Sequence, residues 1–163
     1  MKNYYLDTEF DQTGPTVELI SLALVCEDGR ELYLVNPAAA PTDKWLIDNV
    51  MKNLYADIDV LPDVLPVSTW ATTIFDFIDD YRPRFWAYYA AHDWFLFSRL
   101  FGTFAQFPTG FPQLCFDIEQ YRHFAYAMGR PIVLPAQTST KHNALNDARW
   151  CRDAHRTILE ALR

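Results

Sequence analysis

Apolar residues fall into short continuous runs and into stretches with helical spacing, a mixture that is typical of α/β proteins. The runs predict strands over residues 3–9, 17–27 and 31–35, and Asp28-Gly29 predicts a hairpin turn between the last two. Shorter runs predict two more strands over residues 85–91 and 114–116. We therefore expect a mixed five-stranded sheet, in which an antiparallel three-strand meander is joined by parallel strands.

Helical spacing of apolar residues begins after the meander and then alternates with the later strands. It predicts helices over residues 43–54, 68–81, 94–101, 118–128 and 143–162, with Ser68 and Asp117 as N-terminal caps of two of them. Pro62 and Pro66 predict an irregular loop over residues 58–66. This order of elements predicts an α/β fold with one sheet flanked by helices, in a single domain of residues 1–163.

The composition limits the partners that the protein can bind. The chain has 163 residues, of which 50% are hydrophobic and 16% aromatic, and its formal net charge is −7. Such a balance excludes a protein that coats nucleic acid through a broad basic surface. It does not exclude an enzyme that grips a few nucleotides through bound metal ions, because the ions bring their own positive charge.

The cysteines and the apolar runs bear on the location of the protein. Cys26, Cys115 and Cys151 lie far apart without the spacing of a zinc site, so we expect buried thiols in a reducing compartment. No apolar stretch is long enough to span a bilayer, and the first residues predict a strand rather than a signal peptide. We expect a cytoplasmic protein without a membrane partner.

Two acidic residues stand near the end of the first predicted strand. Side chains alternate along a strand, so Asp7 and Glu9 point to the same side. Two buried like charges repel each other and lose hydration, and a divalent metal ion held by hard oxygen ligands would compensate them. The alternative is a strand that simply ends in a solvated loop.

Further candidate ligands follow a later strand and begin the last helix. Asp93 comes directly after the apolar run 85–91, at the carboxyl edge where sites of α/β sheets form, although it could equally cap the next helix. Asp147 lies among small and apolar neighbours near the start of the last helix, where an unpaired carboxylate is costly. His142 precedes this helix and can approach the same edge from solvent.

The order and spacing of these residues resemble those of a known enzyme family. Asp7-x-Glu9, Asp93 after a strand, and His142 followed five residues later by Asp147 resemble the DEDDh 3′–5′ exonucleases, which include RNase T and polymerase proofreading subunits. Within that family, the segments 7–10, 18–21 and 142–148 resemble the small mycobacterial-type 3′–5′ exoribonucleases. The resemblance spans residues 4–152 and implies a ribonuclease H-like fold.

The resemblance also implies roles for the five residues. Asp7, Glu9, Asp93 and Asp147 match the four metal-binding acids of the family, and His142 matches its general base. Two Mg²⁺ or Mn²⁺ ions held by such acids supply a nucleophile, neutralise charge and stabilise the leaving oxygen of a phosphodiester. A histidine can take the proton of the attacking water near neutral pH.

Recognition of the substrate is expected to involve residues near the first two strands. Phe10 or Trp94 could stack on a terminal base, although core packing is the alternative for both. Glu18 could bind a ribose hydroxyl, which would favour RNA. We therefore expect an exoribonuclease that acts on RNA 3′ ends. A DNA 3′-exonuclease and a catalytically silent ribonuclease H-like binding module remain as alternatives.

Relatives of this family often form homodimers. The aromatic-rich segment 104–111 is a candidate interface for a homodimer here.

Overall fold

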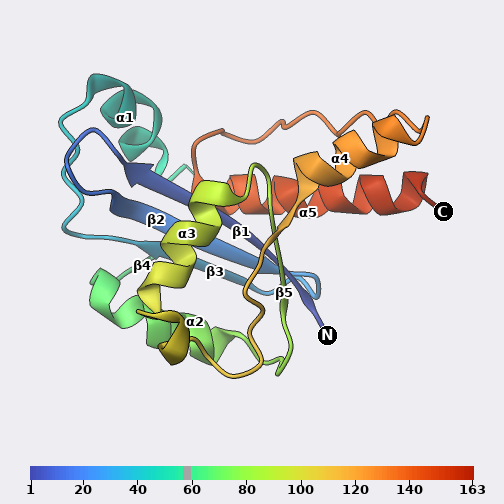
Figure 1. The fold of residues 1–163 in the computed structure, drawn as a ribbon. Coiled ribbons are helices and arrows are strands. Elements are labelled where there is room, and N and C mark those ends of the chain that lie inside the picture. The colour runs from blue at the N-terminus through green and yellow to red at the C-terminus, as the bar shows by residue number, and fades with distance from the viewer. Residues whose placement is uncertain (57–59) are drawn as a thin grey trace.

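Six strands form one mixed sheet in the computed structural model, which describes residues 1–56 and 60–163 (Figure 1). Strands β1 (Asn3–Asp11), β2 (Glu18–Cys26) and β3 (Glu31–Val35) form the antiparallel meander. The other three strands pair in parallel, and the sheet order is β4-β3-β2-β1-β5-β6. They are β4 (Asp63–Val64), β5 (Arg84–Ala87) and β6 (Phe116–Asp117).

Helices cover both faces of this sheet. The α-helices are α1 (Lys44–Asn49), α2 (Trp70–Phe77), α3 (Ala91–Leu100), α4 (Ile118–Ala127) and α5 (Ala144–Ala161). Short 3₁₀ turns are η1 (Met51–Asn53), η2 (Val67–Thr69) and η3 (Phe104–Gln106). Figure 1 shows α3 crossing the near face of the strands and α1 beside the arrowhead of β1.

Alternation along the strands divides the core into two layers. Tyr5 and Ala23 belong to the layer that packs under α1, α4 and α5. Tyr4, Leu6 and Leu24 point the other way and belong to the layer under α2 and α3. Each buried leucine contributes about 1.5–3 kcal/mol relative to an exposed one. Odd-numbered residues of β1 therefore face α5, and even-numbered residues face α3, as far as Glu9.

The expected mixed α/β sheet is confirmed, but it has six strands rather than five. The additional strand β4 pairs Asp63 and Val64 with Leu34 and Val35 of β3. It lies within the expected loop 58–66, whose first two residues fall outside the described residues. A two-residue strand beside prolines has no periodicity by which a sequence pattern could reveal it.

The predicted start and end of α2 were wrong. The side chain of Ser68 does not cap the helix, because residues 67–69 form a 3₁₀ turn and the α-helix begins at Trp70. Trp70 is fully buried, and its indole nitrogen donates a hydrogen bond to the carbonyl of Leu65 (2.9 Å). This anchor determines which face of the helix packs on the sheet, and Phe75 is exposed on the other face.

The segment between β5 and α3 also differs from the prediction. The strand ends at Ala87 rather than at residue 91, and the helix begins at Ala91 rather than at residue 94. Ala90 occupies the N-cap position without a side-chain hydrogen bond, so Asp93 lies inside the first turn and is not the cap. Asp117 does cap α4, accepting hydrogen bonds from the backbone nitrogens of Glu119 and Gln120.

The three cysteines are free thiols, with Cys26 and Cys151 buried and Cys115 partly exposed. None of the described helices is long and apolar enough to cross a membrane.

Candidate active site

Asp7 and Glu9 lie on the half of β1 that extends beyond its pairing with β5. Asp7 is opposite Ala23 of β2, and Glu9 is opposite Ser21. The register of this ladder shifts between Glu9 and Phe10. Such a bulge twists a strand and redirects its side chains, and it commonly occurs next to active sites. Because Asp7 and Glu9 alternate in register with Tyr5, both carboxylates point toward the face that carries α5.

Asp93 reaches the same strand from the other face of the sheet. Its Oδ1 accepts hydrogen bonds from the backbone nitrogen of Thr8 (3.0 Å) and from the Thr8 hydroxyl (2.6 Å). Thr8 lies between the two acids of β1, and Asp93 is only 7% exposed. The parallel pairing of β1 with β5 brings Asp93 to this edge, as the sequence predicted.

The start of α5 positions Asp147 and His142. The side chain of Asn143 caps the helix by accepting a hydrogen bond from the backbone nitrogen of Asn146 (3.1 Å). His142 has a φ of 57°, a left-handed conformation that is uncommon for a residue with a side chain and often marks functional sites. Its backbone nitrogen donates to Oδ2 of Asp147 (3.0 Å), and Gln137 donates to Oδ1.

Three of the predicted residues form a tight group. Ligand atoms of Glu9, His142 and Asp147 all lie within 4.8 Å of one another. A cavity of about 340 Å³ opens beside them, and its walls include Asp7, His142, Asp147 and Lys141. Asp7 and Asp93 lie outside that group but close enough for their charges to act on it. The edge of the sheet thus gathers four carboxylates and one imidazole.

The carboxylates are crowded and poorly hydrated, and this raises their pKa values. Burial raises the pKa of Asp7 well above its ordinary value, and the neighbouring acids raise it further. Burial and the charges of Asp147 and Asp93 raise the pKa of Glu9 to about 8. Burial raises the pKa of Asp93 to about 6, although the hydrogen bonds from Thr8 favour its charged form. Burial also raises the pKa of Asp147.

This donor set fits a divalent cation. Carboxylate oxygens are ligands for Mg²⁺, Mn²⁺ and similar hard ions, and four carboxylates carry enough negative charge to balance such ions. Raised pKa values at several neighbouring acids indicate a site that lacks compensating positive charge. A bound cation would remove the repulsion that the protein side chains do not relieve.

The residues expected to contact substrate lie in three different settings. Phe10 is partly buried and stacks on His92, with ring centroids 5.7 Å apart. Trp94 is partly buried and packs against the core residues Phe85 and Phe97, with ring centroids 5.5 and 5.4 Å away. Glu18 is exposed at the start of β2 and lines a separate groove.

Two residues beside the site were not singled out from the sequence. The indole of Trp45 is 52% exposed and lies edge-on to the His142 ring, with centroids 4.9 Å apart. Trp45 also lines a cleft of about 430 Å³ together with Glu9 and Phe10. Gln137 holds Asp147 from the loop before α5. Trp45 fitted the helical pattern of a core residue, and Gln137 carries no pattern.

Comparison with known proteins gives relatives in sequence and in structure. The 3′-5′ exoribonuclease Rv2179c of Mycobacterium tuberculosis strain H37Rv is 30% identical over 149 residues, which cover 90% of this chain and 86% of the relative. Its counterpart in strain CDC 1551 has the same identity and coverage. No family model matches the chain.

Solved structures of exonuclease I share the fold. The enzyme of Methylocaldum szegediense superposes on this chain with a TM-score of 0.67 at 16% sequence identity. Escherichia coli exonuclease I, in complex with a dT13 oligonucleotide, superposes with a TM-score of 0.67 at 14% identity. Both matches cover 98% of this chain but only 40% and 41% of exonuclease I, so the chain spans about two fifths of those enzymes.

The ribonuclease H-like fold, together with the relatives in sequence, defines a 3′–5′ exonuclease. More specifically, the chain belongs to the family of the mycobacterial 3′–5′ exoribonucleases, by its identity and coverage with those proteins.

Proposed function

We propose that this protein is an exoribonuclease that hydrolyses the 3′-terminal phosphodiester of RNA and releases nucleoside 5′-monophosphates. The observation that carries the proposal is the convergence of Glu9, His142 and Asp147 within 4.8 Å beside Asp7 and Asp93. The names of the mycobacterial relatives support RNA as the substrate.

The four acids are proposed to bind two divalent ions, Mg²⁺ or Mn²⁺. The oxygen ligands would come from Asp7, Glu9, Asp93 and Asp147. A solved structure with the same fold, Escherichia coli exonuclease I with single-stranded DNA, contains zinc. When bound, such ions supply a nucleophilic water of lowered pKa and stabilise charge on the phosphate. Thr8 keeps Asp93 oriented, and Gln137 does the same for Asp147.

His142 is proposed to act as the general base. Its ring projects from the loop before α5 into the cavity that also exposes Asp7 and Asp147. Edge-on contact with Trp45 restricts the orientation of the ring. From there the imidazole can accept a proton from water and return it to solvent.

The terminal base is proposed to bind in the cleft between Phe10 and Trp45. This cleft also exposes Glu9, so a base stacked there would place its 3′ linkage next to the acids. Stacking on an aromatic ring contributes about 1–3 kcal/mol per base and tolerates any sequence. Trp94 is not part of this cleft, because its ring packs in the aromatic core.

A DNA 3′-exonuclease is the second candidate. The observation that favours it is the shared fold with exonuclease I, which has been solved in complex with dT13 and dA13 oligonucleotides. The catalytic residues would act in the same way on either sugar, so only the substrate separates the two candidates.

The proposed function is tested with 5′-labelled RNA and DNA of one sequence, incubated with Mg²⁺ or with Mn²⁺. We expect RNA to be shortened stepwise from its 3′ end faster than DNA. Faster shortening of DNA would establish the second candidate. If neither polymer is shortened under either metal, the chain is not a nuclease.

A further inference from the structure

A groove separate from the candidate active site has the size of a small-ligand site. It encloses about 510 Å³ between the start of β2 and the second half of α3, within the range of small-ligand sites. Leu19 and Leu96 form an apolar part of its wall, while Glu18 and Arg99 are its charged residues. The Asn36 side chain donates a hydrogen bond to the carbonyl of Leu19 (2.8 Å), which keeps that wall in place.

Arg99 is one of several cationic residues of this acidic protein that contact no carboxylate among the described residues. Most of the other cationic residues contact a carboxylate within 4 Å: Lys2, Arg30, Lys44, Lys52, Arg122, Arg149, Arg152 and Arg156. Within the described residues, neither Arg99 nor Lys141 forms an ion pair. Lys141 lines the cavity beside the acids, and Arg99 lines the groove. One unpaired cation therefore lines the cavity beside the acids, and another lines the groove.

The groove is connected to the candidate active site through two elements. Arg99 follows Asp93 by six residues on α3, which is about 9 Å along the helix axis. Glu18 pairs with Asp11 of β1, two residues beyond Glu9 and about 7 Å along the strand. A nucleic-acid strand whose 3′ end lies at the acids can thus reach the groove with its next nucleotides.

We propose that this groove is a subsite for an upstream ribonucleotide of the substrate, in which Arg99 binds a phosphate and Glu18 accepts a hydrogen bond from a ribose 2′-hydroxyl. The proposal rests on the proposed exoribonuclease function and adds to it a source of preference for RNA. A guanidinium is suited to phosphate oxygens. A carboxylate accepts the 2′-hydroxyl that only RNA carries.

The test measures binding with little turnover, by fluorescence anisotropy of 5′-labelled oligoribonucleotides with Mn²⁺ present, in a His142→Ala background that is expected to retain the metal ions and to lose most of the rate. We expect Arg99→Ala to weaken binding of a pentaribonucleotide about ten-fold and to leave a dinucleotide unchanged. The slope of log affinity against log salt should fall by about 0.7, the value for one phosphate contact on a single strand. Arg99→Lys should restore most of the affinity.

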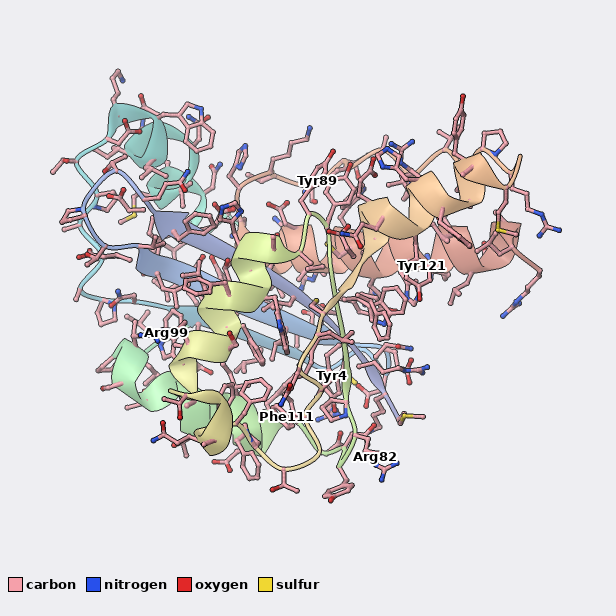
Figure 2. The ribbon with its side chains drawn as sticks, in the orientation of Figure 1. Tyr4, Arg82, Tyr89, Arg99, Phe111 and Tyr121 are labelled. Carbon is pink, nitrogen blue, oxygen red and sulfur yellow. The ribbon has the colours of Figure 1, made fainter. Side chains whose placement is uncertain are left out.

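Arg82→Ala is the matched control. Arg82 is also an exposed arginine without an ion pair among the described residues, and Figure 2 shows it well away from α3 and Arg99. Glu18→Gln should reduce the preference for RNA over DNA pentamers. The subsite is overturned if Arg99→Ala weakens the binding of the dinucleotide and of the pentanucleotide equally, or if it weakens the binding of neither. It is also overturned if Arg82→Ala weakens pentanucleotide binding as much as Arg99→Ala does.

The two proposals fail separately. If Arg99→Ala weakens RNA binding but the wild-type protein never shortens RNA with Mg²⁺ or Mn²⁺, the proposed function is wrong and the subsite stands. A wild type that shortens RNA while Arg99→Ala binds the pentaribonucleotide normally overturns the subsite alone.

Discussion

At the scale of single residues, the sequence reveals those whose type and spacing carry the chemistry. Asp7 and Glu9 share a side by strand alternation, and Asp147 is an acid among apolar helix neighbours. The structure brings them together with His142. Gln137 could not be found this way, because its contact with Asp147 depends on the path of a loop that no local pattern specifies.

Removing the proposed base should separate chemistry from metal binding. We expect His142→Ala to lower kcat on RNA by about 10²- to 10⁴-fold, the usual contribution of a general base. Binding of Mn²⁺ should be retained, because four carboxylates remain. The matched control is His123→Ala on α4, where the side chain is 70% exposed.

Steady-state kinetics and Mn²⁺ titration on the same preparations check this prediction. Unchanged kcat would reject His142 as the base, and loss of Mn²⁺ binding would make it a ligand instead.

At the scale of elements, two helix caps and the long periodic segments were predictable, whereas the short strand β4 was not. Asp43 and Asp117 cap their helices, and α5 follows its amphipathic pattern closely. The two-residue strand β4 depends on its neighbour in the sheet rather than on its own residues. Strand β6 was expected over residues 114–116, and it lies slightly later, at Phe116–Asp117. The start of α2 was missed because the buried Trp70, not a polar cap, determines where it docks.

The contact between α5 and the sheet contains a buried histidine that predicts a pH dependence of stability. His155 is 2% exposed, stacks on Trp86 with centroids 3.7 Å apart, and lies 2.9 Å from the Tyr5 hydroxyl. Burial, with a smaller effect from the charge of Arg84, lowers the pKa of His155 to about 4 from an ordinary 6.5. The unfolded chain therefore binds more protons than the folded one between those values.

Acidification should destabilise the protein through this group. From pH 7 to pH 5, linkage predicts a loss of about 2 kcal/mol in the free energy of unfolding attributable to His155. The carboxylates with raised pKa values act in the opposite direction, but equally in wild type and in His155→Gln.

Urea unfolding of both metal-free proteins at pH 5 and pH 7 isolates the effect. We expect His155→Gln to cost more stability at pH 7 than at pH 5. An equal cost at both pH values would show that His155 does not titrate as its burial predicts.

At the scale of the whole molecule, an acidic protein is proposed to bind an anionic substrate at the edge of the sheet that gathers four carboxylates. The sheet topology makes this arrangement possible, because β1 carries two acids while α3 and α5 approach it from opposite faces. That topology was predictable from the order of elements and from the family resemblance. The positions of Arg99 and Trp45 required the structure, because residue type and helical spacing do not show which exposed side chains lie beside a site.

The central claim is that the acids at this edge bind the metal ions at which the phosphodiester is cut. Counting bound Mn²⁺ by electron paramagnetic resonance, in wild type and in Asp147→Asn, tests it most directly, with circular dichroism as the check that both are folded. We predict two ions per chain in wild type and fewer in Asp147→Asn, which should also lose turnover. A wild type that binds no Mn²⁺, or a folded Asp147→Asn variant that binds it equally well, would contradict the claim.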